Sequence, residues 1–357
     1  TIVYLKKKRN SFLKQEKSKY FFMKKNKFLF KIGVLINICF LIIQLLIMGS
    51  IHFPFNYSLL HLSVPVVFII NFLFFIFWLI RPKWPLLLFI FTLAISFNEW
   101  GMLYKLKDNI INTPKGLYVM SYNVRSFNRF KWLNNKNTPS SIASFVEIKN
   151  PDVVCFQEFY LGEAPLFKNY PYQIFKPYSA NGKIGSCIIS KYPLKNGNPI
   201  FFKGSSNGGM YADLIKFRDT IRIYNVHFES LHLDTEDTIL TTNYSQKIRS
   251  KIENVFKIQE TQINHFNLLA KKSDHPQIIC IDLNNNVFSN SYRNLINDRQ
   301  DAFVEKGEGF GSTYRFSYLP LRIDFILIDP KIKVLDYQTH KVILSDHKPI
   351  SAVLQLP

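Results

Sequence analysis

Residues 277–284, QIICIDLN, contain the pattern that decides the fold of the C-terminal two thirds of this chain. The apolar run indicates a buried β-strand. It ends on Asp282 and Asn284, two polar residues for which a purely structural strand has no use. The stretch LSDHKP at 344–349 adds an acid and a histidine, and the same combination of strand and polar end recurs along the chain.

Eight short runs have the composition of β-strands. They are 117–124, 152–157, 183–190, 209–217, 220–228, 277–283, 322–328 and 350–356. Helices are predicted at 139–149, where Ser140 or Ser141 can cap the N-terminus, and at 246–271. Because strands outnumber helices, we expect an α+β sandwich of sheets flanked by helices rather than a doubly wound parallel sheet.

Polar side chains close most of these strands. They are Asn123, Glu158, Asn225, His227, Asp282, Asn284, Asp324, Asp346 and His347. Taken singly, Asn and Asp at strand ends are usually turn formers. Together they contain what metal-assisted phosphoester cleavage requires: oxygen ligands that suit Mg²⁺, a histidine that can take a proton from water, and Asp324 as a candidate to orient that histidine.

Competing chemistries find less support in the sequence. Cysteine and histidine residues do not cluster with the spacing of a zinc site. The region after residue 116 contains no P-loop or G-x-G-x-x-G motif. Cys155, Cys187 and Cys280 fall inside predicted strands, where we expect free, buried thiols.

The order of the motifs resembles the endonuclease/exonuclease/phosphatase superfamily. The resemblance rests on the series S-Y-N-V, Q-E, N-V-H, D-L-N, R-I-D-F-I and S-D-H-K-P, which begins after Leu117 and runs to the C-terminus. It implies a four-layer α+β sandwich, in which two mostly antiparallel β-sheets pack face to face with helices outside. It also implies a metal site at one rim of the sheets.

The resemblance implies a metal site in which Glu158 is the principal ligand, with Asn123 and Asp346 beside it. The implied cofactor is Mg²⁺, for which Mn²⁺ can substitute. One departure from the family pattern is visible, because Ile281 stands where a glycine usually precedes the aspartate of the D-L-N motif.

The same resemblance implies catalytic roles for five further residues. His347 resembles the catalytic histidine, and Asp324 resembles the acid that pairs with it. Asp282 matches the aspartate that orients or activates the nucleophile. Asn284 and His227 match residues that contact the phosphate.

The N-terminal third has a different composition. Residues 1–31 contain eleven basic residues and a single acid, Glu16, and no charged residue follows until Arg81. Three apolar stretches, at about 32–48, 59–80 and 84–104, are predicted to form an all-α membrane anchor. The positive-inside rule then places the tail in the cytoplasm and the catalytic domain outside it, in a multi-pass protein of the cell (inner) membrane. If the short third stretch does not span, the domain is cytoplasmic.

The predicted organisation is therefore a basic tail at 1–31, a transmembrane region at 32–104, a linker at 105–115 and a catalytic domain at 116–357. Overall composition agrees with a folded chain: of 357 residues, 47% are hydrophobic, four are cysteines, and the net charge is +20. These values exclude a disordered chain and a disulfide scaffold.

Three functional hypotheses stay open. The first is a membrane-anchored, Mg²⁺-dependent phosphodiesterase that acts as a nuclease, with nucleic acid as its substrate. The second is a hydrolase of phospholipid head groups or small phosphomonoesters, motivated by the anchor. The third is a non-catalytic binding module on a membrane tether. The sequence predicts no protein partner. Aromatic residues near Tyr314 are consistent with a substrate-facing loop or with core packing.

Overall fold

The structure is a computed structural model. It describes residues 27–46, 58–80, 84–95, 97–106, 115–216, 219–231, 242–316 and 319–357. The chain separates into two units, one made of Thr1–Phe53 with Val66–Phe97 and the other of Pro54–Pro65 with Asn98–Pro357. Most of the basic tail and of the predicted linker lie outside the described residues.

The first unit is helical. It contains the helix Lys27–Leu46, most of α2 (Ser58–Ile80) and α3 (Pro85–Ile95). By length and composition, Lys27–Leu46 is the one described helix that could cross a membrane. Over 84–104, where a third span is expected, the described residues form α3 and the short α4 (Phe97–Leu103), and Ser96 between them lies outside the described residues.

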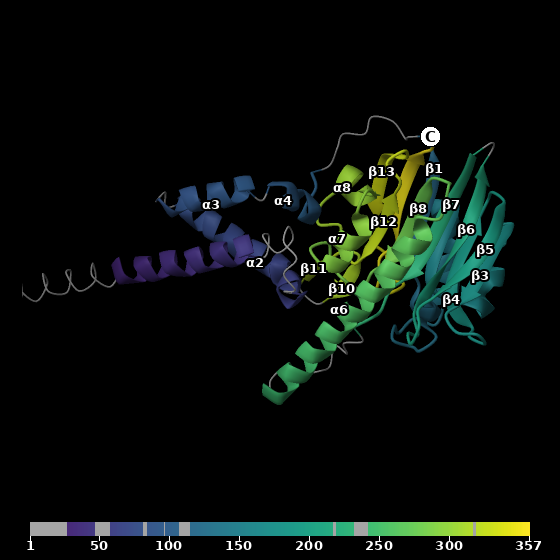
Figure 1. Ribbon diagram of the computed structural model, residues 1–357, viewed down its shortest axis with the longest axis horizontal. Helices are drawn as coiled ribbons and strands as arrows, with labels where there is room; N and C mark the ends of the chain where they lie inside the picture. The colour runs from purple at the N-terminus through teal and green to yellow at the C-terminus, as the bar shows by residue number, and fades with distance from the viewer. Residues whose placement is uncertain are drawn as a thin grey trace, which may run out of the picture. The chain divides into compact units, whose positions relative to one another are not determined.

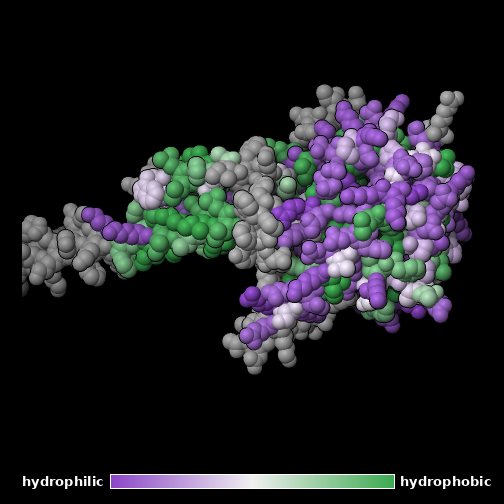
Figure 2. All heavy atoms as spheres, viewed as in Figure 1, coloured by the Kyte–Doolittle hydropathy of each residue, from purple (hydrophilic) through white to green (hydrophobic). Residues whose placement is uncertain are grey.

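Several polar side chains are buried inside this helical unit, while many large apolar side chains lie on its outside. Trp78 Nε1 donates a hydrogen bond to Asn37 Oδ1 (3.1 Å), and Asn71 Nδ2 donates to Gln44 Oε1 (2.7 Å). All four side chains are buried. Figure 2 shows a continuous apolar surface over α2 and α3. This distribution is the reverse of that in a water-soluble helical hairpin.

The second unit contains two six-stranded sheets (Figure 1). The first has the order β13-β14-β1-β2-β4-β3. Its strands are β1 (Leu117–Asn123), β2 (Val153–Tyr160), β3 (Tyr172–Pro177), β4 (Ile184–Ser190), β13 (Lys333–Thr339) and β14 (Ile350–Gln355). The β1–β2 pair is parallel, and the other neighbouring pairs are antiparallel.

The second sheet has the order β5-β6-β7-β8-β12-β9. Its strands are β5 (Leu194–Phe201), β6 (Gly208–Lys216), β7 (Asp219–His227), β8 (Gln277–Asp282), β9 (Gln300–Asp301) and β12 (Asp324–Ile328). Only the β7–β8 pair is parallel. A separate hairpin pairs β10 (Tyr314–Phe316) with β11 (Leu319–Leu321).

Helices cover the outer faces of both sheets, which confirms the four-layer α+β sandwich. Ile142 and Val146 of α5 (Thr138–Lys149) pack on the outer face of the first sheet. Phe266 of α6 (Thr242–Ala270) packs against Tyr224 of the second sheet, and α6 also contacts α7 (Asn290–Ile296). The short α8 (Ala302–Lys306) contacts β12 and β13.

The main core fills the space between the two sheets. Apolar side chains from both inner faces meet there, and Cys155 and Cys280 are among them. Both are free thiols, as is the buried Cys187, which confirms the expectation from the sequence. The core fixes how the strands of one sheet stand against those of the other, and hence where their ends meet.

One detail of α5 differs from the prediction. The N-cap residue is Asn137, and Ser140 and Ser141 lie within the first turns. Pro139 is the second residue of the helix, in the first turn, where its fixed φ and missing N–H favour the start of a helix. The proline therefore sets the start of α5 a few residues earlier than the serines would.

The topology brings the polar strand ends to one edge of the sandwich. The two parallel pairs finish with Asn123 opposite Gln157 and with His227 opposite Asp282. The antiparallel strand β12 starts with Asp324 opposite Asp282. Residues far apart in the sequence thus meet at the same rim.

Candidate functional site

A buried acid–histidine–acid cluster lies at this rim. Asp282 ends β8, Asp324 begins β12, and His347 lies in the loop before β14. His347 Nδ1 is 2.9 Å from Asp324 Oδ2, and His347 Nε2 is 3.6 Å from Asp282 Oδ2. One ligand atom from each side chain lies within 4.8 Å of the others. The imidazole is therefore held between two carboxylates, through a different nitrogen on each side.

The electrostatics of the cluster favour a protonated imidazole. Burial alone would lower the pKa of His347, but the carboxylates of Asp324, Asp282 and Asp346 outweigh it and raise the pKa well above its ordinary value. Burial raises the pKa of Asp324, against the opposing effect of His347. The pair shares its charge in a region from which water is nearly excluded.

Asn123 and Glu158 adjoin the cluster from the first sheet. Asn123 Nδ2 donates to Asp282 Oδ2 (2.7 Å) and to Glu158 Oε1 (3.1 Å), so that one amide joins two carboxylates. Glu158 lies within a bulge in the pairing of β2 with β4, between Phe156 and Phe159, and its φ is 50°. A bulge re-aims a side chain, and a left-handed backbone at a non-glycine residue is typical of functional sites.

His227 lies on the other side of Asp282. Its Nε2 is 3.5 Å from Asp282 Oδ2, 3.9 Å from Glu158 Oε1 and 3.5 Å from Asn207 Nδ2. Its Nδ1 is buried and has no hydrogen-bond partner among the described residues. Three polar side chains thus converge on the single oxygen Asp282 Oδ2, which is the centre of the cluster.

Asn284 also stands in a left-handed conformation, with φ at 52°. Its backbone N–H donates to Asp282 Oδ1 (3.0 Å), and its Nδ2 donates to the Phe228 carbonyl (3.0 Å). Asn284 therefore positions Asp282 and ties β8 to the end of β7. Among the described residues, the side-chain oxygen of Asn284 accepts no hydrogen bond.

Asp346 is engaged by a residue that the sequence analysis did not identify. Arg125 Nη1 donates to Asp346 Oδ2 (2.7 Å), and Arg125 N donates to Asn123 Oδ1 (2.9 Å). Arg125 opens η1 (Arg125–Asn128), whose four residues all have positive φ. Asn128 stabilises this turn through its side chain, which bonds Leu133 in both directions. The sequence does not predict this turn, because its four residues with positive φ include no glycine.

Thr313, which directly precedes β10, and Tyr314, the first residue of β10, support the acid–histidine pair in ways that the sequence did not reveal. Thr313 Oγ1 accepts hydrogen bonds from the backbone N–H groups of Ile323 and Asp324. The ring of Tyr314 meets the His347 ring edge to face at 5.0 Å. Tyr314 was placed in the right segment by the sequence, but its role beside His347 was left open.

Asn225 closes a predicted strand but has a structural role. It accepts a hydrogen bond from Gln157 Nε2 (2.8 Å) and donates to the carbonyls of Phe156 (2.8 Å) and Cys187 (3.0 Å). These bonds join the second sheet to the first in the buried interior. Among the polar residues that close the predicted strands, Asn225 is the one whose side chain points into the core between the sheets.

The donor set at the rim suits a hard divalent cation. Glu158 and Asp282 supply carboxylate oxygens next to each other, and the carboxylate of Asp346 is near enough to affect the His347 pKa. Oxygen ligands of this kind are those that Mg²⁺ and Mn²⁺ prefer. Asp324 is committed to His347 by two contacts, so its role in the pair competes with metal binding.

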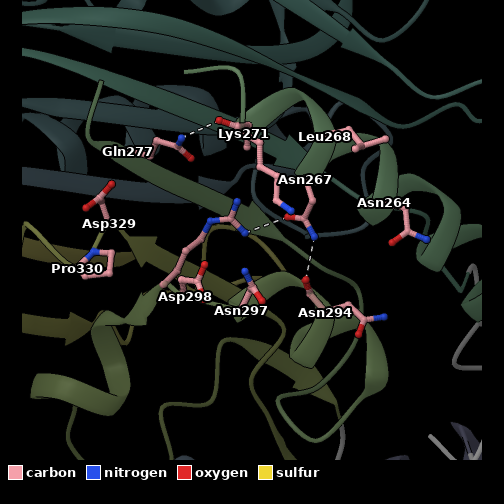
Figure 3. A pocket seen from close by; sticks show the side chains of 12 residues that line it. Asn264, Asn267, Leu268, Lys271, Gln277, Asn294, Asn297, Asp298, Asp329 and Pro330 are labelled. Carbon is pink, nitrogen blue, oxygen red and sulfur yellow. Dashed lines mark hydrogen bonds between the residues drawn. The ribbon is translucent and has the colours of Figure 1, made fainter. Parts of the chain in front are cut away.

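The cavity drawn in Figure 3 lies elsewhere. It has a volume of about 510 Å³ and is lined by the end of α6, the start of β8 and the turns around Asp298 and Asp329. Asn267 connects its walls by hydrogen bonds with Arg299 and the Asn294 carbonyl (Figure 3). It opens at Gln277, the opposite end of β8 from Asp282, and contains no paired acid and histidine.

Comparison with known proteins agrees with this geometry. Residues 120–347 match the model of the Endonuclease/Exonuclease/phosphatase family. The match covers more than half of the chain and spans Asn123 to His347, so this chain belongs to that family. Members of the family are hydrolases that act on phosphoesters. No curated protein matches the chain.

Solved structures share the fold at low sequence identity. A Bacteroides vulgatus endonuclease/exonuclease/phosphatase is 17% identical, with a TM-score of 0.51, over 68% of this chain and 100% of that one. D. rerio TDP2, complexed with a single-strand DNA product, is 16% identical, with a TM-score of 0.52, over 68% and 100%. A Beutenbergia cavernae endonuclease/exonuclease/phosphatase is 15% identical, with a TM-score of 0.51, over 68% and 72%. These likenesses concern the fold alone.

Proposed function

We propose that this protein is a membrane-anchored, divalent-metal-dependent hydrolase that cleaves phosphodiester bonds. The observation that carries the proposal is the convergence of Asp282, Asp324 and His347 at the rim where Glu158 and Asn123 also lie. Family membership limits the chemistry to phosphoesters. The geometry supplies an acid–base pair next to a set of hard oxygen ligands.

His347 is proposed to move the proton of the attacking water. Asp324 holds its Nδ1, which leaves Nε2 directed toward Asp282, the residue proposed to orient the water. As the water oxygen bonds to phosphorus and the leaving oxygen departs, the water proton passes to His347 Nε2. Asp324 stabilises the imidazolium that forms, which is the role of the acid in hydrolase triads.

Glu158, Asn123 and Asp346 are proposed as the residues of the metal site, and Asp282 borders it. When bound, a divalent cation would polarise a phosphoryl oxygen and stabilise the charge that develops on it. Neutralising the carboxylates of Asp282 and Asp346 would also lower the pKa of His347, which both carboxylates raise. His227 and Asn284 are proposed to contact the phosphate, since both flank Asp282.

A membrane anchor is proposed for the first unit. The helix Lys27–Leu46 is long and apolar enough to span. Its neighbour α2 exposes large apolar side chains such as Phe72, Leu73 and Ile80, while Asn37, Gln44 and Asn71 are buried. We propose a multi-pass topology with the catalytic domain outside the cytoplasm, following the basic residues before Lys31. Washing membranes with alkaline carbonate tests the anchor, because an integral protein stays in the pellet.

A substrate panel tests the proposed chemistry. The purified full chain in detergent is incubated with Mg²⁺ and supercoiled plasmid, phospholipid vesicles or p-nitrophenyl phosphate. Plasmid nicking that His347→Ala abolishes would support the nuclease-like function. Nicking that persists in the variant would show a contaminating enzyme.

Hydrolysis of phospholipid head groups is the second candidate. It is favoured by the apolar exterior of the helical unit, which would keep the chain at a bilayer. It requires release of phosphorylated head groups from the vesicles, lost in His347→Ala, together with an intact plasmid. The same panel therefore separates the two substrate classes.

A further inference from the structure

A second cavity lies beside the loop that joins β13 to β14. Its volume is about 810 Å³. One wall comes from Phe145 and Lys149 of α5, another from residues 308–312, and a third from His340, Lys341 and Lys348. It is separate from the carboxylate cluster, whose acids do not line it.

The walls of this cavity carry an excess of positive charge. Lys149, Lys341 and Lys348 line it, and Glu308 is the only acid among the lining residues. Lys149 and Lys341 form no ion pair among the described residues. Lys348 Nζ donates to the Ser312 carbonyl (3.0 Å), which holds the ammonium at the wall without neutralising it.

His340 lines the same cavity as the lysines, and the charge of Lys149 affects its pKa. It is buried at the base of the cavity, with Nε2 at 2.8 Å from Ser351 Oγ and its ring edge to face with Phe145 at 5.4 Å. Burial, and then the charge of Lys149, lower the pKa of His340 to about 4. An anion bound between the lysines would offset this excess of positive charge.

We propose that this cavity binds a small phosphate-bearing anion through Lys149, Lys341 and Lys348. Lysine binds phosphate as a point charge, and the half-buried positions of Lys149 and Lys348 strengthen their contacts with it. The volume lies in the range of small-molecule sites. Phe145 and Phe310 supply apolar surface for the organic part of such a ligand.

The cavity adjoins the loops that carry the proposed catalytic pair. Lys348 follows His347 directly, and its backbone N–H donates to the Thr313 carbonyl (2.6 Å). The hydroxyl of Thr313 in turn accepts from the Asp324 N–H (3.1 Å). An anion on Lys348 would therefore contact the segment that holds both members of the pair.

Calorimetric titration of the full chain in detergent with inorganic phosphate tests the proposal. EDTA is present, so that no metal ion contributes. The test variant is the double substitution Lys149→Gln with Lys341→Gln. The matched control is Lys195→Gln with Lys333→Gln, two exposed lysines of edge strands outside the cavity.

We expect saturable binding that the test variant weakens by at least about tenfold, the equivalent of about 1.4 kcal/mol. The control should bind as the wild type does. Unchanged affinity in the test variant, or no saturable binding to the wild type, would overturn the proposal. Circular dichroism of both variants separates lost binding from lost folding.

A second arm identifies the source of the phosphate. The titration is repeated in nanodiscs of neutral lipid with or without phosphatidic acid. Competition by phosphatidic acid would assign the site to a lipid head group, and equal binding in both discs would assign it to a soluble phosphate. Because this binding is measured without metal ions or turnover, its failure is distinct from a failure of the proposed hydrolase activity.

Discussion

At the scale of single residues, the two nitrogens of His347 face carboxylates with different roles. Asp324 contacts Nδ1 with both oxygens at 2.9–3.0 Å, whereas Asp282 stands 3.6 Å from Nε2. The closer acid fixes the ring and its tautomer. The more distant one leaves space for a reacting group. The site therefore separates positioning from proton transfer.

Substituting the positioning acid tests this division. Asp324→Asn should keep the fold, because the amide can still accept from the Thr313-linked loop, but it should favour the wrong imidazole tautomer. We expect kcat to fall by about 10²- to 10⁴-fold with little change in KM. Steady-state kinetics on a phosphodiester measure this. Asp329→Asn, at the far end of β12, is the control, and equal rates in the two variants would contradict the assignment.

The buried His340 makes a prediction about pH. Its pKa drops from 6.5 to about 4 in the folded protein. Folding therefore resists its protonation, and the free energy of unfolding decreases as the pH falls from 6.5 toward 4. The loss at pH 5 should be about 2 kcal/mol. Urea denaturation at pH 7 and pH 5 measures it.

The matched variants isolate this contribution from those of other titrating groups. His340→Gln removes the titrating ring and should reduce the difference between the two pH values by about 2 kcal/mol. His275→Gln, at an exposed position, should leave the difference as in the wild type. A pH dependence that His340→Gln does not change would show that the burial of His340 carries no such cost.

At this scale, sequence and structure agree where a side chain stands at a strand end. Asn123, His227 and Asp282 stand at the finish of parallel strands, and Asp324 joins them because the antiparallel β12 begins at the same edge. Arg125 could not be predicted, since its position depends on four successive residues with positive φ. Backbone conformations of that kind leave no signature in composition or spacing.

At the scale of elements, burial decides which strands the sequence reveals. The eight predicted strands correspond to β1, β2, β4, β6, β7, β8, β12 and β14, which are the interior strands of the two sheets. The four strands of these sheets that were missed, β3, β5, β9 and β13, form the edges, and β10 and β11 of the separate hairpin were missed as well. Interior strands are covered on both faces and are continuous apolar runs.

Edge strands give a weaker signal because one side of each is open. In β5, LKNGNPIF, most side chains are exposed or half-buried, and the strand contains Gly197 and Pro199. Proline is tolerated at an edge because no neighbouring strand needs its N–H. Such residues also blunt an edge against further pairing. The exposed side chains, glycine and proline that make β5 hard to predict are thus a consequence of its place at the edge of the sheet.

The helical hairpin offers a test of register. Asn37 pairs with Trp78, and Gln44 pairs with Asn71. Asn37 and Gln44 are seven residues apart on one helix, and Asn71 and Trp78 are seven residues apart on the other. Seven residues correspond to two helical turns. The two contacts therefore fix one antiparallel alignment of Lys27–Leu46 with α2. Paired buried polar groups specify register in this way in coiled coils.

Cysteine cross-linking measures the register. In a Cys39→Ser background, Gln44→Cys with Asn71→Cys should form a disulfide under mild oxidation. Gln44→Cys with Trp78→Cys should not, because the shift of seven residues separates the positions by about 10 Å. Cross-linking of the second pair at the rate of the first would contradict the alignment.

At the scale of the whole molecule, the chain combines two parts that obey opposite solvent rules. The catalytic unit buries its apolar residues between sheets and exposes polar ones, whereas the helical unit buries Asn37, Gln44 and Asn71 and exposes apolar residues. The apolar composition of residues 32–80 predicted the apolar exterior of the helical unit. It did not predict the buried hydrogen bonds of Asn37, Gln44 and Asn71.

The family and the carboxylate cluster together make metal-dependent cleavage of a phosphoester the central claim. The most direct test is the hydrolysis of bis(p-nitrophenyl) phosphate by the purified full chain, with Mg²⁺ or with EDTA. Asp282→Asn is measured in parallel with Asp298→Asn, a substitution at an exposed residue away from the cluster.

We expect turnover with Mg²⁺ or Mn²⁺, loss of turnover with EDTA, and recovery when metal is restored. Asp282→Asn should reduce the rate by at least about 10²-fold, while Asp298→Asn should match the wild type. Turnover that survives both chelation and Asp282→Asn would contradict the account, because the activity would then not arise from this site.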